Sequence, residues 1–299
     1  MIDPSQVLRV PLVWLLLLLR PVHAQADCQV FADQAQLEDA RQSWSQTLEA
    51  LPLEQRLRWI AGLHAPDEKA RKEATRQKDC LVRALAKAMS VKSPLRTISS
   101  YRDHAQQRAI WERKYAFRGR AFGRITTATR KDCSDLQGDG RMAWDPLRAT
   151  HRACWKRLSG EQREREILQT SAPPGLSRHH WGTDFDLFDP TLSNPPWRAG
   201  GRLAGVYRWM RTNAWRYGFF QTYAGKSAGQ ELGYTEERWH WSYYPVAGAL
   251  QSDLANHANE FQALLRKQLS DNGHYDLVLK HWRDFAFGVE SPAGDSTSM

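Results

Sequence analysis

The sequence has no hydrophobic run long enough for a transmembrane helix, which needs about 20 apolar residues. Its longest run, VPLVWLLLLL, has ten residues and lies near the N-terminus. Small residues follow at Val22 and Ala24, as they do before a signal-peptidase cleavage site. We therefore predict a signal peptide over residues 1–24, with an uncleaved membrane anchor as the alternative. After cleavage we expect an exported, periplasmic protein with no stable membrane span.

Cysteine is scarce, and the four cysteines lack the CxxC or Cys–His spacing of zinc knuckles. In an oxidising compartment, four cysteines instead suggest two disulfides, which could pair in three ways. We favour Cys28–Cys80 together with Cys133–Cys154, because each bond then closes a separate local segment. The exported protein would then contain no free thiol.

Acidic residues are too few to balance the basic ones. The chain has 33 Asp and Glu against 42 Lys and Arg, which gives a formal net charge of +9. Such a charge often indicates nucleic acid, but we find no basic and aromatic recognition motif and expect export, so we predict no nucleic-acid partner. Cell-wall polymer and lipopolysaccharide are the polyanions outside the cytoplasm. A generally basic, soluble surface is the alternative.

Internal repeats are also absent, and the composition is that of a globular protein. Hydrophobic residues make up 41% of the chain and include 13 tryptophans, which is enough for a sizeable core. Apolar residues at helical spacing predict three helices within residues 31–90, with starts near Pro52 and Asp67. Asp103 and Gln106 form a capping-box pattern that opens another helix.

The pattern changes along the chain and predicts several parts. The Arg- and Gly-rich stretch 117–170 is typical of a long insertion, and a helix beginning near Leu203 should end at Gly218. One apolar stripe follows Tyr244, with a second helix at about 275–285. The predicted parts are a helical subdomain at 25–92, a catalytic domain at 93–247, C-terminal helices at 248–290 and a disordered tail at 291–299.

A first short stretch, SRHHWGTDFDLF at residues 177–188, combines imidazoles with carboxylates. A turn at Gly182 leads into an alternating strand, so Asp184 and Asp186 should share its open face. His179 precedes the turn, and its imidazole can converge with Asp186. A neutral imidazole and a carboxylate are a combination that suits Zn²⁺.

A second stretch, TEERWHWSYYP, places His240 in an aromatic strand and Glu237 three residues earlier. A third protein ligand from His240 would leave the fourth coordination position for water, as in catalytic rather than structural zinc sites. Glu237 could then take a proton from that water and later return it to the leaving amine. The two stretches together predict hydrolytic chemistry at one zinc ion per chain.

Three blocks of sequence carry a family resemblance. They are SSYRDHAQQ, PGLSRHHWGTDFDLF and YGFFQTY…GYTEERWHWSYYP, and they span about 95–247. The patterns S-x-H-x-x-G-x-x-x-D and E-x-W-H-W within them resemble the zinc D-alanyl-D-alanine carboxypeptidases of the vancomycin-resistance type, peptidase family M15. That family shares its fold with the Hedgehog signalling domain.

The resemblance assigns a role to each residue that matches the family pattern. It implies that His179, Asp186 and His240 bind the zinc ion and that Glu237 is the general base and acid. It also implies that Arg102 faces the substrate and the developing oxyanion, where a fixed guanidinium would stabilise the negative charge.

Three more residues of the first stretch need an interpretation. Ser177 matches the serine of the family pattern, which implies a role in substrate binding and a hydrogen bond near the ligand loop. Asp184 departs from the pattern, since many members carry a small residue there; it could alter the local charge or support a ligand. For His180 a hydrogen-bonded core position is the preferred interpretation, with loop support or substrate contact as the alternative.

The resemblance implies a zinc peptidase that acts on peptidoglycan stem peptides and releases terminal D-alanine. The implied fold is α+β: a small antiparallel sheet carrying the zinc site, surrounded by helices, with helical additions at both ends. An endopeptidase that cuts cross-links or stem peptides is the alternative, and a non-catalytic cell-wall-binding module is a third interpretation. The sequence leaves open the bond cleaved and the oligomeric state.

Overall fold

The computed structural model describes residues 28–90, 95–119, 122–136, 138, 140–189, 197–225, 232–270 and 273–290. The predicted signal peptide and the predicted C-terminal tail lie outside these residues. Among the residues that are described, no helix is both long and apolar enough to cross a membrane.

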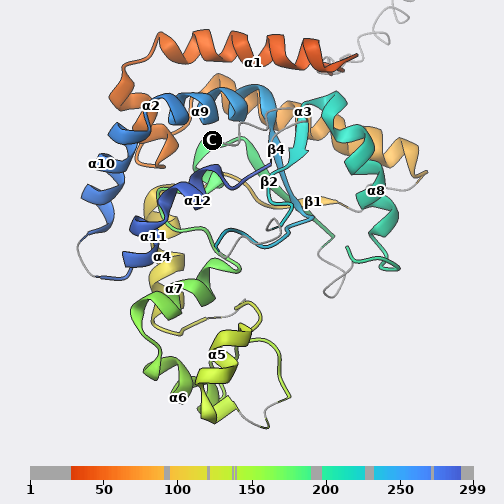
Figure 1. Cartoon of the computed structure of the whole chain (residues 1–299). Helices are drawn as coiled ribbons and strands as arrows, with labels where there is room; N and C mark the ends of the chain where they lie inside the picture. The colour runs from red at the N-terminus through yellow and green to blue at the C-terminus, as the bar shows by residue number, and fades with distance from the viewer. Residues whose placement is uncertain are drawn as a thin grey trace, which may run out of the picture.

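A small antiparallel sheet lies within the helices (Figure 1) and has the strand order β1-β2-β4-β3. The strands are β1 at Arg96–Ser99, β2 at Asp184–Phe188, β3 at Phe219–Gln221 and β4 at His240–Tyr243. The central strands pair so that Asp186 lies opposite His240 and Asp184 lies opposite Ser242. Because side chains alternate along a strand, these four share one face of the sheet. The predicted helix-rich α+β class with a small antiparallel sheet is confirmed.

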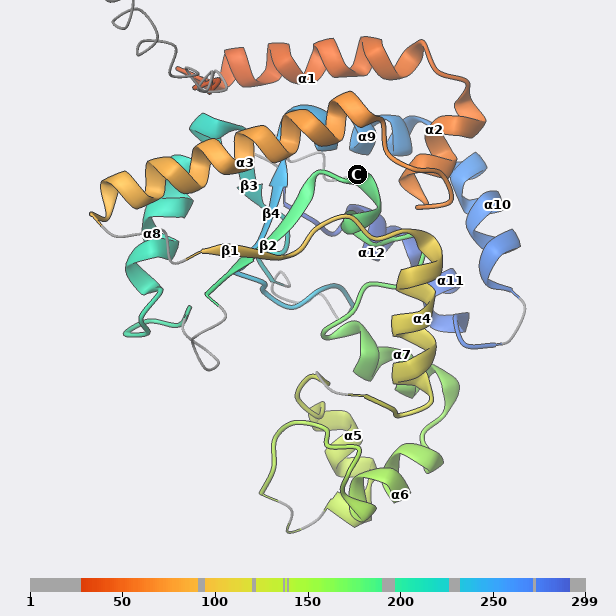
Figure 2. The same cartoon turned by 180° about the vertical axis from the view of Figure 1, so that it is seen from behind.

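The N-terminal helices lie on the other side of the sheet (Figure 2). They are α1 at Gln34–Glu49, α2 at Leu53–Ile60 and α3 at Glu68–Ala88, as the apolar spacing predicted. The side chain of Asp67 caps α3 by accepting from the backbone of Ala70. The hydroxyl of Tyr243 in β4 donates to Glu73 of α3 at 2.7 Å, so the face that carries Tyr243 is the one that α3 covers. The face that carries His240 therefore points away from α3.

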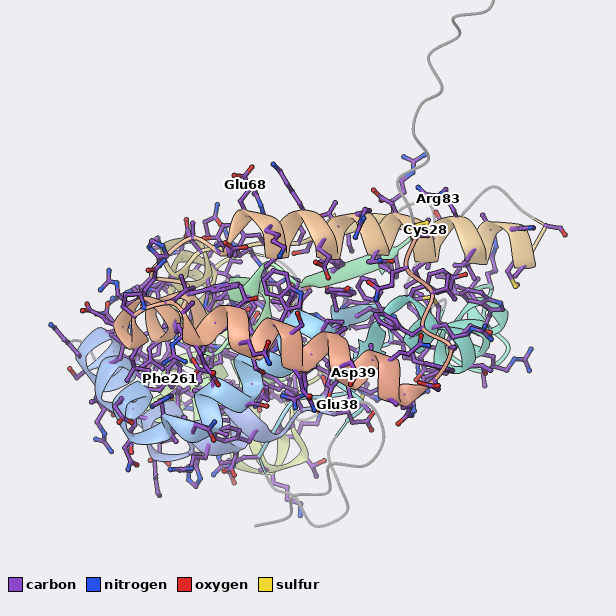
Figure 3. The ribbon with its side chains drawn as sticks, turned by 90° about the horizontal axis from the view of Figure 1, so that it is seen from above. Cys28, Glu38, Asp39, Glu68, Arg83 and Phe261 are labelled. Atoms are coloured by element: carbon purple, nitrogen blue, oxygen red, sulfur yellow. A yellow bond between two sulfur atoms is a disulfide. The ribbon has the colours of Figure 1, made fainter. Side chains whose placement is uncertain are left out.

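Both predicted disulfides are present, Cys28–Cys80 and Cys133–Cys154. Figure 3 shows Cys28 and Arg83 close together beside α3. The guanidinium of Arg83 lies 3.2 Å from each sulfur of this bond. The first disulfide thus ties the start of the described chain to α3.

The C-terminal half is more segmented than the apolar stripe predicted. The predicted helix near Leu203 is α8, at Ala204–Asn213, and a 3-10 turn follows it to Gly218, whose φ of 83° ends it as expected. Beyond the sheet the helices are α9 at Tyr244–Asn256, α10 at Ala258–Leu269, α11 at Asp276–Lys280 and α12 at Trp282–Phe287. The stripe is interrupted at His257, and the expected single helix at 275–285 is two short helices that meet at His281.

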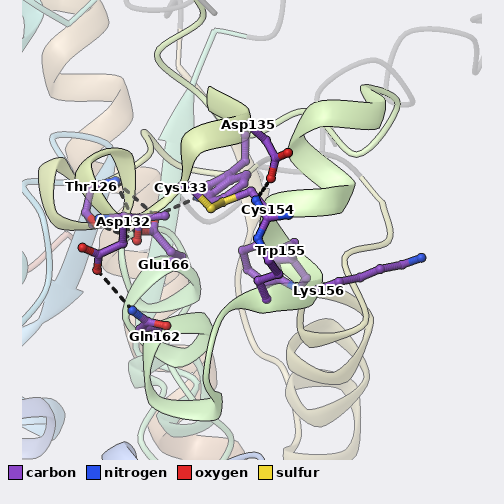
Figure 4. Close-up of a disulfide and its surroundings, with 12 residues drawn as sticks. Thr126, Asp132, Cys133, Asp135, Cys154, Trp155, Lys156, Gln162 and Glu166 are labelled. Carbon is purple, nitrogen blue, oxygen red and sulfur yellow. Dashed lines mark hydrogen bonds and ion pairs between the residues drawn. A yellow bond between two sulfur atoms is a disulfide. The ribbon is translucent and has the colours of Figure 1, made fainter. Parts of the chain in front are cut away.

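The 117–170 stretch forms a helical lobe at the end of the molecule farthest from α1 (Figure 1). Its helices are α5 at Thr127–Asp132, α6 at Ala149–Arg157 and α7 at Gly160–Leu168, and α4 at His104–Tyr115 leads into it. The Cys133–Cys154 disulfide joins the C-terminal end of α5 to the interior of α6, and Glu166 lies beside Thr126 (Figure 4). The capping box predicted for Asp103 and Gln106 is present at the start of α4.

A continuous hydrophobic core connects these parts. One cluster of buried residues runs from Trp44 in α1 through Trp241 in β4 to Phe285 in α12, and it includes Trp155 of the lobe. The division into an N-terminal subdomain, a catalytic domain and C-terminal helices therefore stays a prediction.

Candidate metal centre and active site

The first part of the site is a single 3-10 turn that enters β2. The turn covers Arg178–Trp181 and ends at Gly182, whose φ of 74° lies in the left-handed region that glycine adopts without strain. His179 in this turn places its Nδ1 2.6 Å from the backbone carbonyl oxygen of Ser100. Since a carbonyl only accepts, Nδ1 carries the proton, and the Nε2 lone pair is left to face Asp186 at 3.4 Å.

The second part is the paired register of β2 and β4. His240 is fully buried in β4, and its Nδ1 lies 3.0 Å from Asp186 Oδ1. Its Nε2 lies 2.9 Å from Asp184 Oδ1. One ring nitrogen is therefore held by Asp184, and the other faces the same point as His179 and Asp186.

The three predicted metal ligands come together. One candidate ligand atom from each of His179, Asp186 and His240 lies within 4.8 Å of the other two. Two imidazole nitrogens and one carboxylate oxygen suit Zn²⁺, and three protein ligands leave a coordination position for a reactant. In both histidines the nitrogen that points away from this centre already has a hydrogen-bond partner, as is usual for metal-binding imidazoles. The donor set and its supports thus fit a zinc ion.

Asp184 differs from the sequence expectation. It was predicted on an open strand face, but its side chain is fully buried. Besides His240, it accepts from the hydroxyl of Thr183 at 2.6 Å and the hydroxyl of Ser242 at 3.0 Å, and the buried Arg178 guanidinium lies 3.6 Å away. The face is closed because these neighbours cover it. Asp184 has the contacts of a residue that supports a ligand, which was one of the two roles left open.

The charges around the centre stabilise one another. Burial alone would raise the pKa of Asp186, but the neighbouring His179 and His240 lower it far below its usual range. Burial alone would lower the pKa of His240, yet its hydrogen bonds to Asp184 and Asp186 raise it to about 9. These hydrogen bonds favour the protonated imidazole, and a metal ion bound here would take the place of a proton.

Glu237 lies at the edge of the triad. Its Oε2 is 3.8 Å from His240 Nδ1, and its backbone nitrogen donates to the carbonyl of Tyr223 at 2.8 Å. Burial raises the pKa of Glu237 to about 7, a value at which a carboxylate can both take and return a proton near neutral pH. Its position and pKa suit the role predicted for it.

Two hydrogen bonds hold the backbone of Arg102 against the 3-10 turn. Its amide donates to the carbonyl of His179 at 3.1 Å, and its carbonyl accepts from Nδ1 of His180 at 2.8 Å. Burial lowers the pKa of this guanidinium, while the charges of Asp186 and Glu237 act to raise it. Its buried Nε has no hydrogen-bond partner among the described residues. This Nε–H is therefore a donor that a ligand could use.

His180 and Ser177 complete the turn. His180 is fully buried, and burial lowers its pKa to about 3, so it is neutral. It donates to Arg102 through Nδ1 and accepts from the amide of Gly175 at 3.0 Å through Nε2, which is the hydrogen-bonded position preferred for it. The carbonyl of Ser177 accepts from the amide of His180, but its side chain does not cap the turn. Its role in substrate binding stays a prediction.

Two residues near the site were not predicted from the sequence. The ring of Tyr223 lies 4.6 Å from that of His240, between centroids, and it is buried. Lys114 at the end of α4 is 5% exposed and is influenced electrostatically by Glu237 and Arg102. Tyr223 ends the block YGFFQTY but was given no role there, and Lys114 belongs to no motif. A lysine is ordinarily solvent-exposed.

A basic cavity of about 660 Å³ lies on the other face of the sheet. Phe185 lines it, and strand alternation directs Phe185 away from Asp186. It is therefore distinct from the triad. Its basic lining residues come from α3 and are Arg71, Lys72, Arg76, Lys78 and Arg83.

A family model described as "VanY: D-alanyl-D-alanine carboxypeptidase" matches residues 67–246, which is more than half of the chain. A Haemophilus influenzae protein described as uncharacterized is 32% identical over 80 residues. That alignment covers 24% of this chain and 60% of the other protein, so the chain spans about three fifths of this relative.

Solved structures of low sequence identity are also similar. VanYB in complex with D-alanine-D-alanine is 22% identical with a TM-score of 0.37, over 62% of this chain and 80% of that one. DacB from Streptococcus pneumoniae D39 is 18% identical with a TM-score of 0.34, over 66% and 77% of the two chains. A variant of the D,D-pentapeptidase VanY in complex with Zn(II) is 20% identical with a TM-score of 0.34, over 66% and 83%.

Proposed function

Given that this chain belongs to the VanY family of D-alanyl-D-alanine carboxypeptidases, we propose that it is a zinc-dependent, periplasmic peptidase that releases terminal D-alanine from peptidoglycan stem peptides. The observation that carries the proposal is the convergence of His179, Asp186 and His240, with Glu237 and Arg102 beside them. A module that only binds cell wall would have no need for a proton-transferring carboxylate whose pKa is about 7.

The metal contributes one element of the chemistry. When bound by the triad, Zn²⁺ supplies a Lewis acid that polarises the scissile carbonyl and makes a water molecule more acidic. The chain's own residues hold the ligands for this purpose. Ser100 and Asp184 each accept from the outer nitrogen of a histidine, which fixes the tautomer and direction of His179 and His240.

Glu237 and Arg102 then act on the substrate. Glu237 accepts a proton from the attacking water and delivers it to the departing amine, so that peptide and water become a carboxylate and an amine. In this proposal Arg102 stabilises the negative charge that develops on the carbonyl oxygen, and backbone hydrogen bonds to His179 and His180 hold its main chain beside the ligand turn. The pKa of Glu237 near 7 suits both halves of its proton transfer.

Product identification tests the proposal. Purified peptidoglycan and a synthetic pentapeptide ending in D-Ala-D-Ala are incubated with the zinc-loaded protein, and the products are identified by mass spectrometry. We expect the mass of the pentapeptide to fall by one alanine, with loss of activity after chelation and recovery with Zn²⁺. Elemental analysis should give about one zinc per chain, lost on His240→Ala.

Two results would count against this function. Release of cross-linked or internal fragments without free alanine would indicate an endopeptidase. A zinc-loaded protein that binds peptidoglycan but changes no bond would indicate a binding module.

A further inference from the structure

Lys114 is a buried cation without an anionic partner. It lies in the last turn of α4 and is 5% exposed. Its Nζ donates one hydrogen bond, to the hydroxyl of Thr170 at 2.8 Å, and lies 5.8 Å from the centre of the Phe122 ring. Among the described residues, no carboxylate lies within ion-pair distance of it. A buried ammonium usually has a charged partner, because removing it from water is costly.

The surroundings of Lys114 belong to the proposed active site. Glu237 and Arg102 both act on its charge, and Lys114 in turn lowers the pKa of Glu237. Arg102 precedes α4 and Lys114 lies in its last turn, and the positive charges of both lower the pKa of Glu237. Geometry gives the same neighbourhood: Lys114 bonds to Thr170, and the adjacent Gln169 accepts from Thr235, two residues before Glu237.

Two residues of the lobe contact the side chain of Lys114. Thr170 and Phe122 both come from the 117–170 stretch, which therefore borders this part of the site. The hydroxyl of Thr235, two residues before Glu237, donates to the carbonyl of Gln169 at 2.7 Å. The end of the lobe is thus attached both to Lys114 and to the segment that carries Glu237.

We propose that Lys114 binds the C-terminal carboxylate of the substrate peptide and so restricts the enzyme to bonds at a free C-terminus. This inference rests on the proposed peptidase function and gives it a specificity-determining residue. An ammonium has three donors and Lys114 uses one, so two remain for a carboxylate. A carboxylate would also supply the missing charge partner. An internal peptide bond has no such group to offer.

A matched pair of peptides tests the inference. One is an N-acetylated peptide ending in D-Ala-D-Ala with a free carboxylate, and the other is its C-terminal amide. The wild-type enzyme should prefer the acid. Lys114→Met keeps the length of the side chain and removes its charge, so it should raise KM for the acid about 10- to 100-fold, the usual range for a charge-assisted hydrogen bond. KM for the amide should not change.

Two further variants control for general effects. Lys156→Met removes a lysine whose side chain extends into solvent from the same lobe (Figure 4), and it should alter neither KM. Lys114→Arg keeps the charge and should retain part of the preference for the acid. The inference would be overturned if Lys114→Met raised KM equally for the acid and the amide peptide. It would also be overturned if the variant kept the wild-type preference for the acid.

Binding measurements separate this inference from the proposed function. The zinc-loaded Glu237→Gln protein, with and without Lys114→Met, is titrated with the acid and amide peptides by calorimetry. If binding of the acid depends on Lys114 but the wild-type enzyme hydrolyses neither peptide, the proposed function fails and the role of Lys114 stands. If Lys114→Met leaves both Kd values unchanged, Lys114 does not bind the carboxylate, whatever the wild-type activity.

Discussion

The proposed role of Glu237 can be tested by replacing one carboxylate oxygen with an amide nitrogen. Glu237→Gln keeps the shape of the side chain but cannot accept a proton from water. General acid–base catalysis contributes roughly 10²- to 10⁴-fold, and Glu237 would serve in two steps, so we expect kcat to fall by about 10⁴-fold or more. Zinc content and melting temperature should stay close to wild type. A variant that trims stem peptides within a few-fold of wild type would show that another group is the base.

The pH dependence of kcat/KM should reflect the ionisation of two buried groups, Glu237 and Lys114. Glu237 must be ionised to accept a proton, and burial raises its pKa to about 7, so kcat/KM should fall as the pH drops below that region. The positive charge of a bound metal moves this acid limb to about 7 or lower. Burial lowers the pKa of Lys114 to about 8, so carboxylate binding should weaken as the pH rises above that value.

The resulting profile of kcat/KM against pH should be bell-shaped for the free-acid peptide. For the amide peptide, or in Lys114→Arg, the alkaline limb should disappear because no titrating ammonium is involved. An alkaline limb that is identical for both peptides would assign it to a different group.

Asp184 should control metal affinity without touching the metal. Asp184→Asn removes the charge that holds His240 through its outer nitrogen, and losses of about 10- to 100-fold in affinity are typical for such supports. It also leaves the buried Arg178 without its carboxylate, so the melting temperature should fall. Competition with a chromogenic chelator measures the affinity. An unchanged zinc affinity would limit the role of Asp184 to packing.

The sequence predicted which side chains converge better than it predicted their surroundings. His179, Asp186 and His240 stand at recognisable spacings, and the strand register brings them together. The burial of Asp184 could not be predicted from strand alternation, because alternation gives the face and not what covers it. Lys114 was missed for a similar reason: its neighbours Thr170 and Phe122 come from a segment with no motif.

Among the elements, the lobe depends on one buried carboxylate. Glu166 accepts from the hydroxyls of Thr126 and Thr129 at 2.6 Å each, from Nε1 of Trp144 at 2.8 Å and from Nε2 of Gln169 at 2.9 Å. It therefore joins α7 to the start of α5 and to the loop between α5 and α6. A residue with so many donors around it cannot be removed without leaving some of them unpaired.

Glu166→Ala should therefore destabilise the protein by about 3 kcal/mol. Glu161→Ala, at an exposed position in the first turn of the same helix, should cost less than about 1 kcal/mol. Urea denaturation of both variants measures the difference. Equal stability of the two variants would mean that water replaces Glu166 without cost.

Helix boundaries were predictable where a capping residue marks them. Asp67 and Asp103 mark the start of a helix, and Gly218 marks a stop. The break at His257 was not, because the apolar stripe keeps helical spacing from Leu254 to Phe261 across it. Spacing records which side chains face the core. It does not record whether the backbone between them stays helical.

At the scale of the whole molecule, the two disulfides fasten opposite ends. Cys28–Cys80 holds the start of the described chain on α3, and Cys133–Cys154 holds the lobe. Thiol titration of the denatured, non-reduced protein should find no free cysteine. Reduction should lower the melting temperature, since losing a native disulfide typically costs about 2–5 kcal/mol. Four titratable thiols without reductant would contradict both bonds.

The 3-10 turn and the segment before α4 are held to each other by three hydrogen bonds. His179 and His180 each donate to a carbonyl of that segment, at Ser100 and Arg102, and the amide of Arg102 donates to the carbonyl of His179. A displacement of this edge of the sheet consequently moves the backbones of His179, the proposed metal ligand, and Arg102, the proposed oxyanion-facing cation, together. Such a displacement leaves the separation of the two backbones unchanged, whereas two segments anchored independently could move apart.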